Sequence, residues 1–350
     1  MLEIFVRANS GGKPLGKPDL LLSNLTVHWD GRNAREEMKI LVDELNAVLN
    51  DGCRMKKKVL HQDFVLKSCL VLCEEMEVAY NIHTFNKETC IAILDEWDDM
   101  KPAIVEAVRL ANSFGLNGAN LTSTNALIPI AYFIHRGRGR VRLHSDSESD
   151  AHNADLIRRW LILSLINGVF SGSSDSMLSS IRKVIQHHSG EAMNFPLADI
   201  DGAILRGKRT ATSDPKGIDR ILDLRYKDKR CLLSLTLLFE ERRWGALRPE
   251  IDHIFPQEAF KSYLHRHKHL KDHFGNLTLL MDSDNRAKKN MAFQEWINTR
   301  EPNFRRRHLI PEDRVLWKVE NFPEFLEERN RLIRQHLKSI LSVGRAHAAS

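Results

Sequence analysis

Short stretches in the last third of the chain carry side chains suited to cleaving a phosphodiester bond. Asp252 and His253 are adjacent, and Asn285 follows further along. Carboxylate and amide oxygens are hard ligands of the kind that Mg²⁺ takes, and such an ion keeps positions for water and phosphate. An imidazole with a pKa near neutrality can accept a proton from water. Asp252 and Asn285 are therefore candidate ligands of a Mg²⁺ or Mn²⁺ cofactor, and His253 is a candidate general base.

Neighbouring side chains on a strand point to opposite faces, so Asp252 and His253 can serve one site only where a strand ends. Pro256 supplies such an ending. The apolar residues at 277–280, after a Gly-Asn turn signal, predict a second strand antiparallel to the first. The expected local order is strand, loop, strand and then helix.

The polar sequence Asp282-Ser283-Asp284 resembles a helix start. It predicts a helix that runs to about Trp296 and carries Asn285 on its first turns. The basic residues beside Asn285 are candidate contacts to a nucleic-acid backbone, although they are equally compatible with a solvated helix surface. These residues are Arg286, Lys288 and Lys289.

This order and these residues resemble the HNH family, also called ββα-metal nucleases. The second element, Gly-Asn-Leu-x-Leu-Leu, looks like that of the C-terminal nuclease domain of GmrSD-type, modification-dependent restriction enzymes. The resemblance implies that His253 is the general base, that Asp252 and Asn285 bind the metal, and that Asn276 holds the His253 loop in place. It makes His253 and Asn276 the catalytic pair and DNA the expected substrate and partner. RNA is left open.

Each fragment also has an ordinary structural explanation. An Asp-His pair alone is more often a surface turn or a hydrogen-bonded core histidine, and Gly-Asn alone is a turn signal. The combination with an Asn-x-x-Lys sequence beyond favours a nuclease, and an inactive descendant of one is the alternative.

The N-terminus offers a second motif. Residues 4–15 begin as an apolar strand and enter a Gly-Gly turn, and a helix is expected after Pro18. On spacing alone this is a simple strand-turn-helix junction. The string nevertheless looks like the Phe-x-Arg-x-Asn-x-x-Gly-x-x-Leu motif of the N-terminal domain of GmrSD-type proteins, which has a ParB-like or sulfiredoxin-like core. The resemblance implies nucleotide binding through Arg7, Asn9 and Gly12.

The companion motif of that domain, Asp-Gly-Gln-Gln-Arg, is not present, since the chain has no Gln-Arg dipeptide. We therefore expect an N-terminally truncated domain and no nucleotide hydrolysis by this chain alone. A separate N-terminal subunit or a homo-oligomer is a possible partner.

Composition is that of an ordinary soluble protein, with 42% hydrophobic and 28% charged residues among 350. No apolar run approaches the roughly 20 residues of a membrane span, and no signal peptide is evident, so we expect a cytoplasmic protein without a membrane partner. The five cysteines include no Cys-x-x-Cys pair, which indicates a reducing compartment and no structural zinc.

The net charge is +6, and residues 248–350 hold 19 Lys and Arg against 14 Asp and Glu. This local surplus suits a polyanionic partner. The densest basic clusters, at 136–142 and 305–307, are compatible with backbone contacts or with exposed loops.

The middle of the chain has helical periodicity, so the expected fold is mainly α. The expected helices are 34–49, 56–80, 87–114, 123–135, 154–170, 174–187 and 230–241, with a last helix from Pro323 to about Leu341. Polar loops are expected at 137–150 and 207–217. The expected domains are a ParB-like remnant at 1–30, a helical domain at 31–241, and an HNH-type nuclease with a C-terminal helix at 242–350.

Histidines at 265, 267, 269 and 273 suggest a metal site, but the segment is basic and lacks cysteines, so a surface loop that might contact DNA is favoured. Two function classes follow. The first is a metal-dependent DNA endonuclease in a restriction or phage-defence system. The alternative is a catalytically inactive or partner-dependent nucleic-acid-binding subunit.

Overall fold

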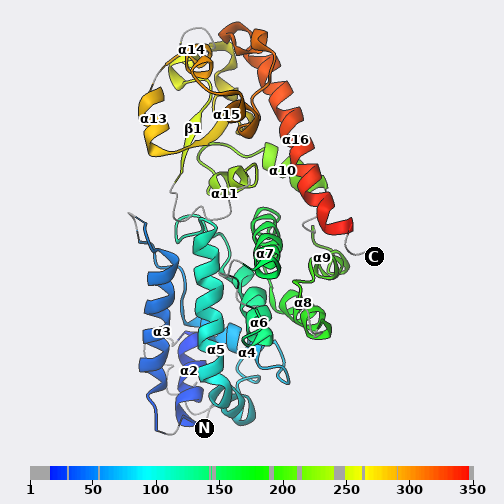
Figure 1. Cartoon of the computed structure of the whole chain (residues 1–350). Coiled ribbons are helices and arrows are strands. Elements are labelled where there is room, and N and C mark those ends of the chain that lie inside the picture. Colours follow the sequence, from blue (N-terminus) through cyan, green and yellow to red (C-terminus); the bar gives the residue numbers. More distant parts are fainter. Residues whose placement is uncertain are drawn as a thin grey trace.

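The computed structural model describes residues 16–29, 31–53, 56–141, 143, 147–188, 193–210, 215–239, 249–261, 265–289 and 291–346. The chain is mainly helical, as the sequence predicts. Figure 1 shows an elongated molecule, with the N-terminal helices at one end and a small sheet surrounded by short helices at the other. Among the described residues, no helix combines the length and apolar character needed to cross a bilayer.

The first half of the chain forms a body of packed helices. Its helices are α2 (Lys17–Val27), α3 (Ala34–Leu49), α4 (Gln62–Leu72), α5 (Lys87–Ser113), α6 (Ile128–Gly137), α7 (Glu148–Ile166), α8 (Asp175–His187) and α9 (Leu197–Arg206), with a 3-10 turn, η2 (Thr124–Leu127), before α6. Asparagine caps explain two sharp starts: Asn33 accepts from the first backbone amides of α3, and Asn86 does the same for α5.

Several expected boundaries were wrong. Helix α4 covers only the middle of the expected 56–80 helix, and α11 (Cys231–Thr236) covers only part of 230–241. Helix α9 was not predicted, and α10 (Pro215–Leu222) begins inside the expected 207–217 loop because proline is favoured in the first turn of a helix. The N-terminal motif residues Arg7, Asn9 and Gly12 lie outside the described residues, so the ParB-like remnant remains a prediction.

The predicted strand, loop, strand, helix order is present in the C-terminal part. Strand β1 (Glu250–His253) pairs antiparallel with β2 (Leu277–Leu280), so that Asp252 lies opposite Thr278 and His253 opposite Leu277. Helix α13 (Asp282–Lys288) follows β2. It does not run to Trp296 as expected, because the backbone turns at Lys289, whose φ is +46°, and a separate helix, α14 (Phe293–Asn298), begins beyond.

Short elements complete this part: η3 (Gln257–Lys261), η4 (His265–Leu270), η5 (Phe274–Asn276), α15 (Pro302–Arg307), η6 (Arg314–Trp317), η7 (Val319–Asn321) and the long α16 (Phe322–Ala346). The Phe255 ring lies 4.6–5.1 Å from the rings of Phe293, Phe322 and Phe325, which ties the end of β1 to α14 and α16. This aromatic core fixes the position at which β1 ends, and therefore the position of His253.

One hydrophobic cluster extends across both ends of the molecule, while the aromatic core around Phe255 is separate from it. Leu277 and Leu279 of β2, together with Ile333 and Leu337 of α16, belong to the same buried cluster as the helical body. Helix α16 extends back along the molecule toward α9 (Figure 1), and the Arg159 guanidinium of α7 donates to the backbone oxygen of Ile340 at 3.0 Å. The expected domain boundary at residue 242 remains a prediction, but contacts cross it.

A buried arginine joins α16 to the sheet. Arg329 is 1% exposed, and its guanidinium donates to the backbone oxygens of Gly275 at 2.7 Å, Leu277 at 2.8 Å and His308 at 3.2 Å. Burial lowers its pKa to about 9. Gly275 permits this close approach, because a Cβ there would lie 2.3 Å from Asn330 Oδ1.

Two histidines, the buried His308 and the partly buried His273, predict loss of stability in acid. Burial lowers the pKa of His273 to about 4 and that of His308 to about 3. Since both values lie below the ordinary 6.5, the unfolded chain binds more protons than the folded one below about pH 6.5, and stability falls as the pH drops. At pH 5 His308 should cost about 2 kcal/mol of unfolding free energy, and the partly exposed His273 should cost less, because solvent screens its charge.

Urea denaturation at pH 7 and pH 5 measures this loss. His308→Gln should reduce the difference between the two pH values, because glutamine takes up no proton on unfolding. An unchanged difference in that variant would contradict the assignment to His308.

Candidate active site

One cleft of about 820 Å³ brings the predicted residues together. Asp252 and His253 from β1, Asn285 from α13 and Lys289 just beyond it all line this cleft. Other residues, none of them a predicted site residue, complete the lining: Tyr226, Glu250, Ile251, Pro256, Gln257, Glu258 and Lys261. Asp252, His253 and Asn285 therefore lie close together, and they border an open cleft rather than an apolar interior.

His253 is held on both sides of its ring. It is 5% exposed, its Nε2 lies 2.9 Å from Asp272 Oδ1, and its Nδ1 lies 3.3 Å from Gln257 Nε2. A carboxylate only accepts hydrogen bonds, so the ring proton is assigned to Nε2 and the lone pair to Nδ1. Burial lowers the pKa of His253, while Asp272 opposes that shift. A neutral imidazole with a basic Nδ1 facing the cleft results.

Asp252 forms an ion pair with Lys288. The Lys288 ammonium donates to the Asp252 carboxylate and to the backbone oxygen of His253. Lys288 is only 1% exposed, its ammonium lies 4.7 Å from the ring centroid of Trp296, and burial lowers its pKa. The expected contact between Lys288 and a DNA phosphate is therefore not available in this structure, because an ammonium sealed in this way cannot reach a ligand. The side chain instead holds α13 against β1.

Asn285 and Glu250 form the outer edge of the cleft. Asn285 Nδ2 donates to Glu250 Oε2 at 2.6 Å, which leaves the amide oxygen as the acceptor a cation could use. Glu250 precedes Asp252 by two positions on β1, so both side chains lie on the same face of the strand. Oxygen atoms from Glu250, Asp252 and Asn285 thus border one space.

Asn276 is fully buried, and its side chain joins two segments of the site. Its Oδ1 accepts from the backbone amide of Phe255 at 3.0 Å, and its Nδ2 donates to the backbone oxygen of Lys271 at 2.9 Å. Phe255 follows His253 by two residues, and Lys271 precedes Asp272. The contacts are those of a residue that holds the His253 loop, which makes Asn276 a positioning residue rather than a group facing the cleft.

The remaining predicted groups are distributed as follows. Arg286 and Lys289 are exposed, and Lys289 borders the cleft. The histidine-rich segment forms the turn η4, which is largely exposed. This agrees with the surface loop that the sequence favoured over a metal site. No group of three His, Cys, Asp or Glu side chains within the described ranges is arranged to hold a metal ion.

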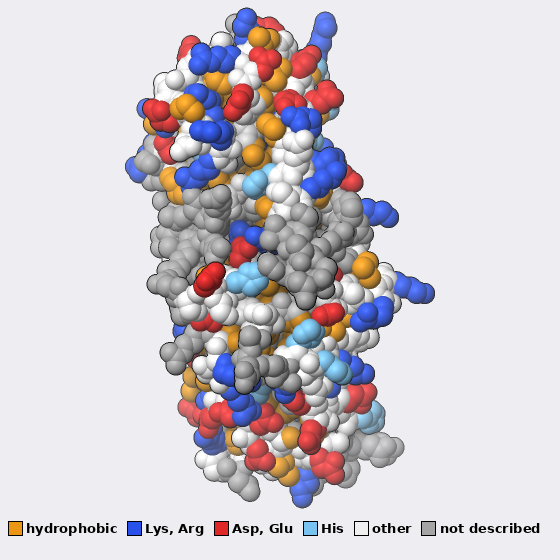
Figure 2. Space-filling view, turned by 45° about the vertical axis from the view of Figure 1, so that its right-hand side comes forward, with side chains coloured by type: hydrophobic (Ala, Val, Ile, Leu, Met, Phe, Trp, Pro, Cys, Tyr) orange, Lys and Arg blue, Asp and Glu red, His pale blue; other side chains and the backbone are white. Residues whose placement is uncertain are grey.

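Figure 2 shows Lys and Arg side chains interspersed with Asp and Glu at both ends of the molecule, rather than a continuous basic patch among the coloured side chains of that face. Arg136 is paired with Glu74 at 2.6 Å, and Arg138 lies 3.5 Å from Glu96. In the second cluster, the Arg305 guanidinium lies 5.5 Å from the Trp317 ring centroid. Several of these cations therefore have structural partners.

The sequence interpretation missed Asp272, Glu250, Gln257 and Tyr226. Glu250 and Gln257 could have been found from strand alternation and proximity to His253. Asp272 lies in the loop between the strands and Tyr226 precedes the nuclease motif by more than twenty residues, so only the tertiary contacts identify them.

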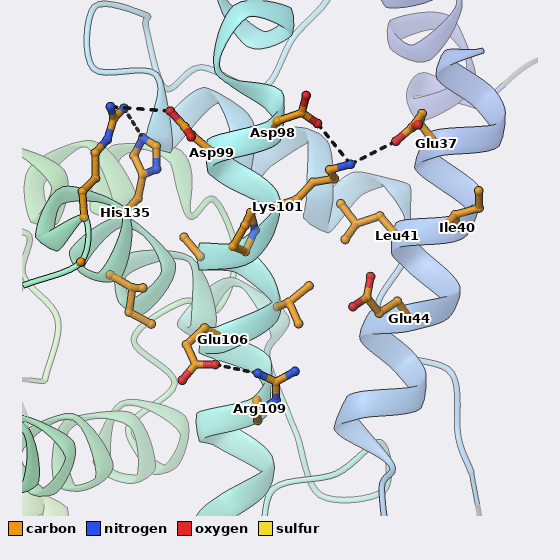
Figure 3. A pocket seen from close by; sticks show the side chains of 16 residues that line it. Glu37, Ile40, Leu41, Glu44, Asp98, Asp99, Lys101, Glu106, Arg109 and His135 are labelled. Atoms are coloured by element: carbon orange, nitrogen blue, oxygen red, sulfur yellow. Dashed lines mark hydrogen bonds and ion pairs between the residues drawn. The ribbon is translucent and has the colours of Figure 1, made fainter. Parts of the chain in front are cut away.

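A slightly larger hollow of about 870 Å³ lies between α3, α5 and α6 (Figure 3). Several of its charged groups are paired with one another: Lys101 with Glu37 and Asp98, and Arg109 with Glu106. The cleft beside β1 brings together a neutral histidine, carboxylate and amide oxygen atoms and an exposed lysine, and it is the better candidate active site.

Residues 209–336 match a protein-family model described as GmrSD restriction endonucleases, C-terminal domain. This part of the chain is a GmrSD-type C-terminal domain. The match includes both strands, α13 and every residue that lines the cleft, and it confirms the resemblance to the C-terminal domain of GmrSD-type enzymes. No curated protein matches the sequence.

The GmrSD match begins at residue 209 and so includes α10 and α11 together with the sheet. This agrees with the contacts of Tyr226, whose ring centroid lies 4.7 Å from that of His253. The GmrSD domain indicates a restriction-endonuclease type of nuclease, with DNA as the corresponding substrate.

Proposed function

We propose that the chain is a metal-dependent endonuclease that hydrolyses DNA phosphodiester bonds in a restriction system directed against foreign or modified DNA. The proposal rests chiefly on one observation: Asp252, His253, Asn285 and Lys289, drawn from separate stretches, line a single cleft. The neutral, oriented imidazole of His253 supplies the base that hydrolysis requires. A reducing cytoplasmic compartment is part of the proposal.

The oxygen atoms at the cleft fit Mg²⁺ or Mn²⁺ by their chemistry. Two carboxylates, Glu250 and Asp252, and the amide oxygen of Asn285 are hard donors, and an ion held by few protein ligands keeps positions for water and phosphate. When bound, such an ion supplies Lewis-acid stabilisation of the phosphate and of the leaving oxygen. This HNH-type assignment adds Glu250 to the ligands expected from the sequence.

The protein's own groups account for proton transfer and positioning. Nδ1 of His253 accepts a proton from water as the water oxygen forms a bond to phosphorus and the bond to the leaving oxygen breaks. Asn276 keeps the His253 loop in register through Phe255. Lys289, exposed at the cleft, is placed to contact a phosphate, and Arg286 is a further candidate for the DNA backbone.

The test is nicking of supercoiled plasmid by the full chain, with Mg²⁺, Mn²⁺ or chelator, on modified and unmodified DNA. We expect cleavage only with the metal. Asn285→Ala should raise the metal concentration needed for half-maximal rate about tenfold or more, while DNA affinity changes little. Asn303→Ala, an exposed asparagine on α15, is the matched control.

Two outcomes count against the proposal. Cleavage that persists in chelator would exclude the metal, and a larger loss of DNA affinity than of metal dependence in Asn285→Ala would exclude its role as a ligand.

A second candidate function is a non-catalytic DNA-binding subunit that needs a partner chain. The observation that favours it is the ion pair between Asp252 and Lys288, which already neutralises the carboxylate expected to bind metal. This candidate predicts DNA binding that weakens linearly with the logarithm of salt concentration, but no nicking with any metal.

A further inference from the structure

We propose that Asp272 is the residue that positions the general base: its carboxylate holds the proton of His253 on Nε2 and thereby leaves the lone pair on Nδ1, on the side of the ring that contacts the cleft residue Gln257. This inference rests on the proposed hydrolytic function and adds a residue that the sequence motif does not contain. Its basis is the 2.9 Å contact between His253 Nε2 and Asp272 Oδ1.

The loop that carries Asp272 is fixed at several points. Tyr226 donates its backbone amide to the backbone oxygen of Asp272 at 3.0 Å, and Phe274 donates to the backbone oxygen of Leu224 at 3.2 Å. The buried Asn276 side chain holds the preceding residue, Lys271, from the other side. These hydrogen bonds hold the backbone on both sides of Asp272 in place, so that its carboxylate stays within reach of the imidazole.

The same anchors connect Asp272 to the rest of the site. The buried side-chain amide of Asn276 forms hydrogen bonds with the segment after His253 and with the segment before Asp272. It therefore sets the distance between His253 and Asp272. The Tyr226 ring packs beside the imidazole, with 4.7 Å between ring centroids and 44° between planes, and so limits its rotation. Tyr226, Asp272 and Asn276 therefore form a frame around His253.

Orientation of this kind has a chemical consequence. A neutral imidazole exists as two tautomers, and only the one with its proton on Nε2 offers a basic Nδ1 to the cleft. An asparagine in place of Asp272 could donate to Nε2, which would favour the tautomer with its proton on Nδ1. The base would then be blocked although the site kept its shape.

The test compares Asp272→Asn with Asp272→Glu in the full chain. We expect Asp272→Asn to lower the cleavage rate at saturating DNA by about 10²-fold to 10⁴-fold while DNA affinity stays within about twofold, because the tautomer changes and the fold does not. Asp272→Glu keeps an acceptor carboxylate and should recover part of the rate. Asp199→Asn is the control, since Asp199 forms a comparable pair with His188 at 2.8 Å on the exposed surface of the helical body.

Nitrogen-15 NMR of the histidine rings gives a readout independent of cleavage. The signal of His253, assigned by its loss in His253→Ala, should show the proton on Nε2 in the native chain and on Nδ1 in Asp272→Asn. If the tautomer is the same in both, the positioning role is wrong. If the native chain fails to cut DNA but the tautomer switches, the proposed function is wrong and the role of Asp272 in fixing the ring stands.

Discussion

Replacement of His253 by alanine will reduce DNA cleavage by about 10²-fold to 10⁴-fold, the range expected when a general base is removed. The imidazole is the group in the cleft that combines a lone pair facing the lining residues with a fixed partner on its other nitrogen. Alanine leaves water without a proton acceptor at that point, while the ligands on β1 and α13 remain.

The measurement is the single-turnover rate of plasmid nicking at saturating protein, together with DNA affinity and a thermal melt. His83→Ala, an exposed histidine in the helical body, serves as the matched control and should cut at the native rate. A His253→Ala protein that folds normally and cuts as fast as the native chain would exclude His253 as the base.

The second large effect is expected on stability. Arg329→Leu should lower the free energy of unfolding by about 3 kcal/mol or more, because the backbone oxygens of Gly275, Leu277 and His308 lose their charged donor and remain buried. Arg331→Leu is the control on the same helix. Arg331 is exposed and pairs with Glu328 one turn away, and such surface pairs contribute about 0–1 kcal/mol.

Urea denaturation of both variants measures the difference. Arg329→Leu should also lose nuclease activity at a lower urea concentration than the native chain does. The reason is that Gly275 and Leu277, which Arg329 binds, flank Asn276. An Arg329→Leu protein as stable as the native chain would mean that the apolar replacement compensates for the lost hydrogen bonds.

Local sequence signals predicted the parts of the site that lie close together in the chain. The apolar alternation and turn residues around His253 and Asn276 were enough to predict an antiparallel strand pair, since strand pairing follows from local pattern. The same reasoning placed Asn285 on the helix after β2. The burial of Lys288 could not be predicted, because it depends on Trp296 lying beside the ammonium, across a chain reversal at Lys289 that helical periodicity does not reveal.

The helical body was predicted well where apolar periodicity covers a whole helix, as for the expected helices 34–49 and 87–114, whose starts the structure caps with Asn33 and Asn86. It was predicted less well where apolar residues continue past a helix end, as beyond Leu72 at the end of α4. Asp272 and Tyr226 show the limit most clearly. Asp272 and Tyr226 contact His253 only because the loop between the strands packs against a segment that lies far away in the sequence. Neither periodicity nor motif spacing encodes such a contact.

The common core of the two ends has a practical consequence for anyone who divides this chain for experiments. A fragment cut at residue 242 would lack Tyr226, and it would leave Leu277, Leu279, Ile333 and Leu337 without much of their apolar cover. Such a fragment should self-associate through its exposed apolar residues. It should also lose the Tyr226 ring that packs against the His253 imidazole. Inactivity of the fragment would therefore say nothing about the activity of the intact chain. A cut before α10, which retains residues 215–222 against α16, would preserve more of that cover.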